Sequence, residues 1–178
     1  MLKTILTYGT AAGLIVGVPL TVLTLSMDGH HMMQWGMLVG YGLMLLAFTT
    51  IFVAIKSRRD GPCGGVIGFW PAFGMGIGIA FVAGLFYVLA WEIGQALSGG
   101  DFARTYSDAI IAQQRAAGAS AEALARSTAE MAEFRKSYAN PLFRLPMTFI
   151  EIFPVGVLVS VVAAALLRNS RFMPVRRD

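Results

Sequence analysis

Four long runs of apolar residues set what this chain can fold into. The first two carry no charged side chain, and the third and fourth carry one each, Glu92 and Glu151. A bilayer core about 30 Å thick needs about 20 apolar residues when it is crossed by a helix. A single all-α membrane domain, residues 1–178, with four transmembrane helices is therefore predicted. The predicted spans are residues 5–25, 35–55, 66–97 and 145–167.

Composition supports the same class of protein. Of the 178 residues, 56% are hydrophobic and 13% are charged, which is more apolar side chain than a soluble domain of this size can bury. The first run is too long for a typical signal peptide and no small-residue cleavage site follows it, so we expect it to be retained as a span. The single Cys63 excludes an internal disulfide framework. The lipid bilayer is the first expected partner.

The basic residues predict the orientation of the chain. Those beside span ends gather at the N-terminus, in the link between the second and third spans and in the C-terminal tail, whereas the link between the first two spans has none. The long third link carries five Lys or Arg with acidic residues interspersed, and long links cross the membrane with less regard to charge. By the positive-inside rule, both termini are expected in the cytoplasm, and the excess of positive charge is not expected to bind nucleic acid. The residues concerned are Lys3, Lys56, Arg58, Arg59, Arg168, Arg171, Arg176 and Arg177.

The segment 101–139 is then an exterior amphipathic helical hairpin between the third and fourth spans. Asp101 and Ser120 are expected to cap its two helices, and Gly118 is expected to end the first. Each helix carries an apolar stripe at helical spacing. Two interpretations stay open: a hairpin that lies on the membrane or extends the bundle, and a surface that docks a partner.

Small residues recur at every fourth position within the apolar runs. Gly9, Gly13 and Gly17 form the clearest stripe. Such stripes allow close approach of helix backbones in lipid, where no hydrophobic effect drives helices together. They favour a tight four-helix bundle and would equally suit a homo-oligomer or a membrane-protein partner. The other stripes are Gly36 with Gly40, and Gly76 with Ala80 and Gly84.

The acidic residues of the spans are expected to lie at similar depth. Glu92 follows Trp91 near the outer boundary, and Glu151 is 17 residues from Arg168, about 25 Å at the helical rise. Arg144 precedes Glu151 by two helical turns on the same face. A polar cluster of Glu92, Glu151 and Arg144 is predicted. It could be a structural ion pair, a proton or cation site, or a catalytic carboxylate pair.

Two prolines and two histidines complete the candidate residues. Pro154 and Pro19 each lack an N–H inside a predicted span, so a kink is expected at both. His30 and His31 lie in the methionine-rich segment 27–33, which suits copper only weakly. A solvated loop is the preferred interpretation there, and no metal or cofactor is predicted.

Three stretches resemble a known family of small bacterial four-span membrane proteins, the domain of unknown function 4199. They are "GMLVGYGLMLLAFTTIFVAIKSRRD", "GGVIGFWPAFGMGIGIAFVAGLFYVLAWE" and "NPLFRLPMTFIEIFPVGVLVSVVAAALLRN". The resemblance covers residues 8–169 and implies a multi-pass protein of the bacterial inner membrane, without implying an activity. The further residues that carry the motifs are Tyr41, Arg59, Asn140 and Pro141.

Three hypotheses for function follow from the residues. The first is a non-enzymatic membrane subunit or scaffold that packs with itself or with a partner. The alternative is a small ion- or proton-coupled transporter that uses the Glu/Arg cluster, although no inverted repeat supports it. A membrane-embedded enzyme is less favoured, because the sequence lacks HExxH, nucleophile–base and phosphate-loop motifs.

Overall fold

The structure is a computed structural model that describes the backbone of residues 1–26, 29–99 and 102–174. The side chains of residues 26–35 and 37 lie outside the description. Six helices and no strand make up the described part of the chain, which confirms the all-α prediction. They are α1 (Leu2–Ser26), α2 (Gly29–Asp60), α3 (Phe69–Leu97), α4 (Phe102–Ala116), α5 (Ala121–Tyr138) and α6 (Pro141–Leu167).

Four of these helices, α1, α2, α3 and α6, are long and apolar enough to cross a membrane. This confirms the predicted number of spans, and the chain is a multi-pass membrane protein. Most boundaries differ from the sequence prediction by a few residues, and those of α2 and the start of α6 differ most. Helix α2 begins at Gly29, so the backbone is helical from that residue, where a loop was predicted. A helix is held by backbone hydrogen bonds and can start before its side chains become apolar.

Helix α6 also begins earlier than predicted, at Pro141 instead of residue 145. Asn140 is its N-cap, and the side-chain oxygen of Asn140 accepts a hydrogen bond of 3.0 Å from the backbone N–H of Leu142. Pro141 then occupies the first helical turn, where a missing N–H costs nothing. The cap therefore sets the helix start, one turn before the apolar run.

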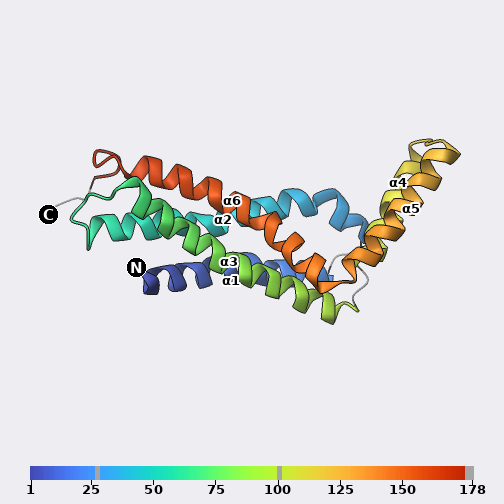
Figure 1. Cartoon of the computed structure of the whole chain (residues 1–178), viewed down its shortest axis with the longest axis horizontal. Coiled ribbons are helices and arrows are strands. Elements are labelled where there is room, and N and C mark those ends of the chain that lie inside the picture. The colour runs from blue at the N-terminus through green and yellow to red at the C-terminus, as the bar shows by residue number, and fades with distance from the viewer. Residues whose placement is uncertain (27–28, 100–101, 175–178) are drawn as a thin grey trace.

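The four long helices form a ring in the order α1, α3, α6, α2 (Figure 1). Helix α3 packs most closely against α1 and α6, and α2 closes the ring against the same two helices. Fully buried side chains such as Phe48, Met75 and Ile152 fill the space between them. The start of α1 and the end of α6 lie at the same end of the bundle (Figure 1), as an even number of crossings requires.

The glycine stripes are used for packing within the chain. A Cβ added at Gly9 would lie 2.6 Å from Cβ of Val82 on α3, and one at Gly17 would lie 3.0 Å from Cβ of Ala90. Gly13 faces Phe86 in the same way. Helix α3 therefore covers the Gly9–Gly13–Gly17 stripe, so that this face is not free for a second chain.

The second face of α3 meets α6 through small residues as well. A Cβ at Gly76 would lie 2.6 Å from the Ser160 hydroxyl, and one at Gly84 would meet the ring of Phe149. Gly40 on α2 is different, because nothing lies within 4 Å of its Cβ position. Among the described residues, the closest contacts between helix backbones and neighbouring side chains thus involve α3, which packs against both α1 and α6.

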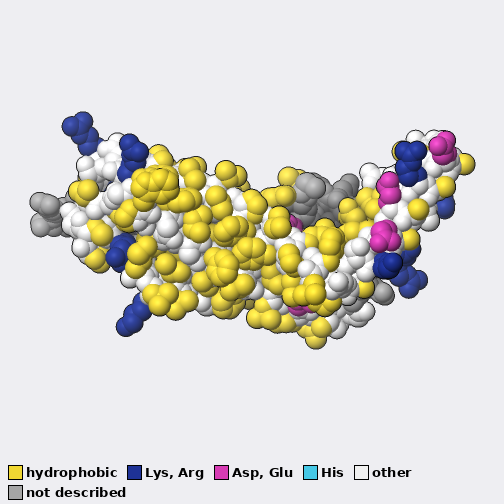
Figure 2. Space-filling model, in the orientation of Figure 1, with side chains coloured by type: hydrophobic (Ala, Val, Ile, Leu, Met, Phe, Trp, Pro, Cys, Tyr) yellow, Lys and Arg dark blue, Asp and Glu magenta, His cyan; other side chains and the backbone are white. Residues whose placement is uncertain are grey.

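The outside of the bundle is apolar and its ends are charged. Large side chains such as Leu45, Leu85 and Leu158 are exposed, and Figure 2 shows a hydrophobic surface along the bundle with charged side chains at its two ends. An exposed apolar belt of this kind suits contact with lipid, which buries what the protein leaves uncovered.

Helices α4 and α5 form a hairpin that projects from the end of the bundle opposite the N-terminus (Figure 1). Gly118 ends the first helix with a positive φ of 76°. The hydroxyl of Ser120 caps the second by accepting a 3.2 Å hydrogen bond from the N–H of Ala123. Both signals were predicted from the sequence; Asp101, the other expected cap, lies outside the described residues.

Candidate functional site

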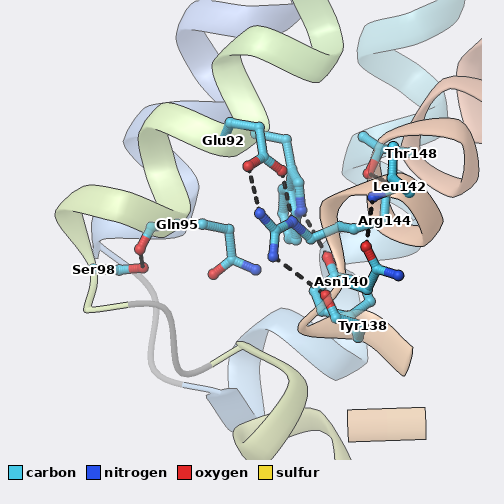
Figure 3. A network of polar contacts seen from close by, with 9 residues as sticks. Glu92, Gln95, Ser98, Tyr138, Asn140, Leu142, Arg144 and Thr148 are labelled. Atoms are coloured by element: carbon cyan, nitrogen blue, oxygen red, sulfur yellow. Dashed lines mark hydrogen bonds and ion pairs between the residues drawn. The ribbon is translucent and has the colours of Figure 1, made fainter. Parts of the chain in front are cut away.

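The main polar site of the described chain lies where the hairpin joins the bundle (Figure 3). Nε of Arg144 on α6 donates to Oε1 of Glu92 on α3 at 2.7 Å, and Nη2 donates to Oε2 at 2.6 Å. Both side chains are mostly buried, with 19% and 28% exposed. A bidentate arginine–carboxylate pair is among the strongest polar contacts in proteins, and this one fixes α3 to the start of α6.

Arg144 also reaches the hairpin. Its Nη1 donates a 3.2 Å hydrogen bond to the carbonyl of Tyr138, the last residue of α5. The guanidinium carbon lies 5.7 Å from the centre of the Tyr138 ring, within range of a cation–π contact. One side chain therefore contacts α3, α5 and its own helix α6.

Tyr138 is the second centre of this junction. Its hydroxyl accepts a 2.7 Å hydrogen bond from Nε1 of Trp91 on α3. Burial raises the pKa of Tyr138, although hydrogen bonds from Trp91 and Gln95 act in the opposite direction. A phenol is neutral at physiological pH in any case, and the raised pKa extends to higher pH the range in which this ring packs without a charge.

An aromatic cluster extends from the bundle into the base of the hairpin. The ring centre of Phe102 lies 4.8 Å from that of Trp91, edge to face, and 5.7 Å from that of Tyr138. Phe134 and Tyr106 continue the cluster along the hairpin. Edge-to-face pairs contribute about 0.5–1.5 kcal/mol each beyond their buried area. The hairpin is thus attached to the bundle by packing as well as by charge.

A cavity of about 560 Å³ opens beside the ion pair. It is bounded by the end of α3, the start of α4, the end of α5 and the start of α6. Within its wall, Gln95 is only 6% exposed, and its Oε1 is buried with no hydrogen-bond partner in the part of the chain that the structure describes. The residues that line the cavity are Glu92, Gln95, Ala96, Gly99, Ala103, Arg104, Arg135, Tyr138, Ala139 and Arg144.

The third member of the predicted cluster lies apart. Glu151 is on an exposed face of α6, two turns beyond Arg144, and its carboxyl lies near the hydroxyl of Tyr87 on α3. The ion pair of Arg144 is formed with Glu92 alone. The structure therefore brings Glu92 and Arg144 together and places Glu151 in a different setting.

Arg59 forms a second polar centre at the opposite end of the bundle. Its side chain is fully buried and pairs with Asp60 at 2.6 Å. Nη1 and Nη2 donate to the carbonyls of Phe172 and Met173 at 2.8 and 2.6 Å. This arginine thus connects the last turn of α2 to the turn that follows α6.

The remaining predicted residues do not join either centre. Tyr41 is exposed on α2, and α1 and α6 continue as helices through Pro19 and Pro154, so the kinks stay a prediction. The side chains of His30 and His31 lie outside the described residues. Among the described residues, no group of three or more histidine, cysteine or acidic side chains could hold a metal.

Three residues of the cavity were missed at the sequence level. Gln95 follows Glu92 by one helical turn and shares its face, a spacing that could have identified it. Arg104 and Arg135 lie at opposite ends of the hairpin sequence, and the antiparallel return of α5 brings them to one cavity. Their proximity could have been predicted only from knowing which residues of α4 and α5 lie opposite each other in the hairpin.

Comparison with known proteins agrees with the resemblance seen in the sequence. No curated protein and no solved structure matches the chain. The family described as "Protein of unknown function (DUF4199)" matches residues 7–169, which covers all four spans and the hairpin. The chain therefore belongs to the DUF4199 family.

Proposed function

We propose that the protein is a non-enzymatic membrane subunit of the bacterial inner membrane, which holds a helical hairpin outside the bilayer for a partner protein. The observation that carries this proposal is the attachment of the hairpin. Glu92–Arg144, Trp91–Tyr138 and the Phe102 contacts fix its base to two spans. A hairpin that only covered the membrane surface would not need these contacts, which fix its base to the bundle.

The surface of the hairpin supports the same role. Its apolar stripes face each other, with Tyr106 packed against Phe134. Its outer faces carry exposed charged side chains of both signs, such as Arg104, Glu122 and Arg126. Such a surface is water-soluble, and mixed charges give orientation and specificity to a protein contact.

The proposed orientation places both termini in the cytoplasm and the hairpin outside. The basic end of the bundle supports it, because Lys56, Arg58 and Arg168 gather beside the end opposite the hairpin. The native Cys63 offers a test. In intact spheroplasts, a membrane-impermeant maleimide should leave wild-type Cys63 unlabelled and should label Ala125→Cys in a Cys63→Ser background. Labelling in the reverse order would overturn the proposed orientation.

The partner is tested by a photo-crosslinking residue placed in living cells. At Ala129, which is exposed on α5, it should give one discrete protein adduct. At the lipid-facing Leu158, the matched control, it should give none. A hairpin that yields no adduct at Ala129 or Ala125, while the protein remains folded, would contradict the proposed role.

The ion-coupled transporter receives less support from the same residues. Glu92 and Arg144 neutralise each other through two short hydrogen bonds, whereas a carrier needs a charge that is free to bind and release its ion. Glu151 lies outside this pair, so a carrier of this kind would depend on Glu151 alone. The non-enzymatic role is also favoured because the ion pair occupies the groups that would act as acid or base.

A further inference from the structure

The cavity at the base of the hairpin has the properties of a ligand site. Its volume of about 560 Å³ lies within the range of small-molecule pockets, roughly 300–1,000 Å³. Its wall contains Oε1 of Gln95, which is buried without a hydrogen-bond partner among the described residues. An unpaired buried acceptor is unfavourable, so a ligand that supplies an N–H or O–H donor to it gains affinity.

The charge of the cavity selects an anion. Three arginines line it, Arg104, Arg135 and Arg144, against one carboxylate. Glu92 is already neutralised by Arg144. Arg104 and Arg135 remain, and the acidic neighbour of Arg104, Asp108, lies 3.9 Å away as an exposed and weak partner. Guanidinium groups bind phosphate oxygens in bidentate geometry.

The position of the cavity points to a lipid. Gln95 lies in the last turn of a membrane-spanning helix, where the polar headgroups of a bilayer are located. Apolar side chains that neighbour the lining residues along the chain are exposed, Leu97 by 66% and Phe143 by 45%. They offer an apolar surface for acyl chains close in sequence to the residues that line the cavity. Figure 3 shows the Gln95 amide directed into the space beneath Arg144.

We infer that this cavity binds the headgroup of a phospholipid. The phosphate lies between Arg104 and Arg135, and an ammonium or hydroxyl group of the headgroup donates a hydrogen bond to Oε1 of Gln95. Phosphatidylethanolamine and phosphatidylglycerol carry such a donor, whereas phosphatidylcholine does not. The bound lipid contacts both the hairpin and α3, and thus stabilises the orientation of the hairpin relative to the bundle.

The test is native mass spectrometry of the full chain released from detergent, titrated with lipids of identical acyl chains. Phosphatidylethanolamine should bind about tenfold more tightly than phosphatidylcholine, the ratio expected for one well-formed hydrogen bond to a charged donor. In Gln95→Met, which keeps the size of the side chain, this ratio should fall to about one. Phosphoethanolamine, the free headgroup, should bind far more weakly than the lipid.

Two arginine variants separate the phosphate contact from general effects. Arg104→Gln with Arg135→Gln should weaken the binding of both phospholipids by about tenfold or more. Arg126→Gln is the matched control, because Arg126 is an exposed arginine of α5 that does not line this cavity. These positions are on the surface, so the variants test binding even if Gln95→Met were to unfold.

The inference is overturned by any of three results. Equal affinity of the wild type for phosphatidylethanolamine and phosphatidylcholine would show that Gln95 accepts no hydrogen bond from the headgroup. An affinity of the double arginine variant equal to that of Arg126→Gln would remove the phosphate contact. Binding of phosphoethanolamine or inorganic phosphate as tightly as the lipid would make the site one for a free anion.

Discussion

The two ends of the bundle are each organised around one arginine, but they differ in what the arginine leaves unsatisfied. Arg59 is fully buried, and its hydrogen bonds end on Asp60 and on two backbone carbonyls. Arg144 is partly exposed and borders a cavity in which Gln95 has an orphaned acceptor. The first end is closed and the second is open.

This difference teaches how to separate structural from functional polar groups inside a membrane protein. A buried charge in lipid must be compensated wherever it occurs, so the presence of an arginine distinguishes nothing. What distinguishes the hairpin end is the adjacent space together with an unpaired acceptor. We therefore expect substitutions at Arg59 to affect stability alone, and those around Arg144 to affect stability and binding.

The largest effect is expected for Arg59→Gln. It removes the donors to the carbonyls of Phe172 and Met173 and one of the two basic partners of Asp60, which keeps its contact with Lys56. Each acceptor left unpaired costs about 1–3 kcal/mol, so that a total loss of roughly 2–6 kcal/mol is expected. Thermal unfolding in detergent should show it, together with faster proteolysis after residue 168. Arg58→Gln, one residue away, is the control; an equal loss there would mean that the closed end is not specific to Arg59.

Arg144→Gln should cost less, about 2 kcal/mol, because hydrogen bonds to a charged group contribute about 1.5–3 kcal/mol and this pair is partly hydrated. The double variant with Glu92→Gln should lose less than the sum of the two single variants, since each single change strands the other charge. Denaturation of the four proteins gives the coupling. Full additivity would show that the pair does not hold the junction together.

Gly13→Ala tests the region that both ends share. The new methyl group would meet Phe86 on α3, and overpacking of this kind costs about 1–3 kcal/mol. Unlike the two arginine changes, it should loosen both ends equally. Protection of backbone amides from hydrogen exchange, measured at both ends, is the readout. Gly40→Ala has open space around its Cβ position and should be neutral; a similar loss there would argue against tight α1–α3 packing.

The smallest effect is a pH dependence at the open end. Because the pKa of Tyr138 is raised by burial, its stabilising contribution is fully present below the unfolded pKa of about 10. It is lost as the pH rises from that value through the higher folded pKa, because in this interval the folded state still binds the proton and the unfolded state does not. The difference in melting temperature between wild type and Tyr138→Phe should therefore change above pH 10. A difference that stays constant to pH 12 would contradict this.

The sequence predicted what depends on local chemistry. The spans followed from the length that lipid demands, and the hairpin ends followed from Gly118 and Ser120, whose roles are decided within one turn of helix. The starts of α2 and α6 were misplaced because apolarity reports contact with lipid, whereas helices begin at caps.

Partner choice across helices was less predictable. Arg144 and Glu151 share a helix face, so the sequence joined them with Glu92 in one cluster. In the structure, Arg144 crosses to α3 and forms both bonds with Glu92. Helical spacing gives the face of a residue, but not which neighbouring helix a long side chain reaches. The burial of Arg59 depends on a turn more than 100 residues later in the chain, which no local pattern reveals.

The short connection between α5 and α6 couples the orientation of the hairpin to that of α6. Only Ala139 and Asn140 separate the two helices, and Arg144 bonds across the break. Helix α5 has 18 residues, about 27 Å at the helical rise. Transmembrane helices adjust their tilt to bilayer thickness, and a change of about 10° in α6 would swing the hairpin tip by about 5 Å over that length. A change in the tilt of α6 would thereby appear as a displacement of the hairpin tip relative to the bundle.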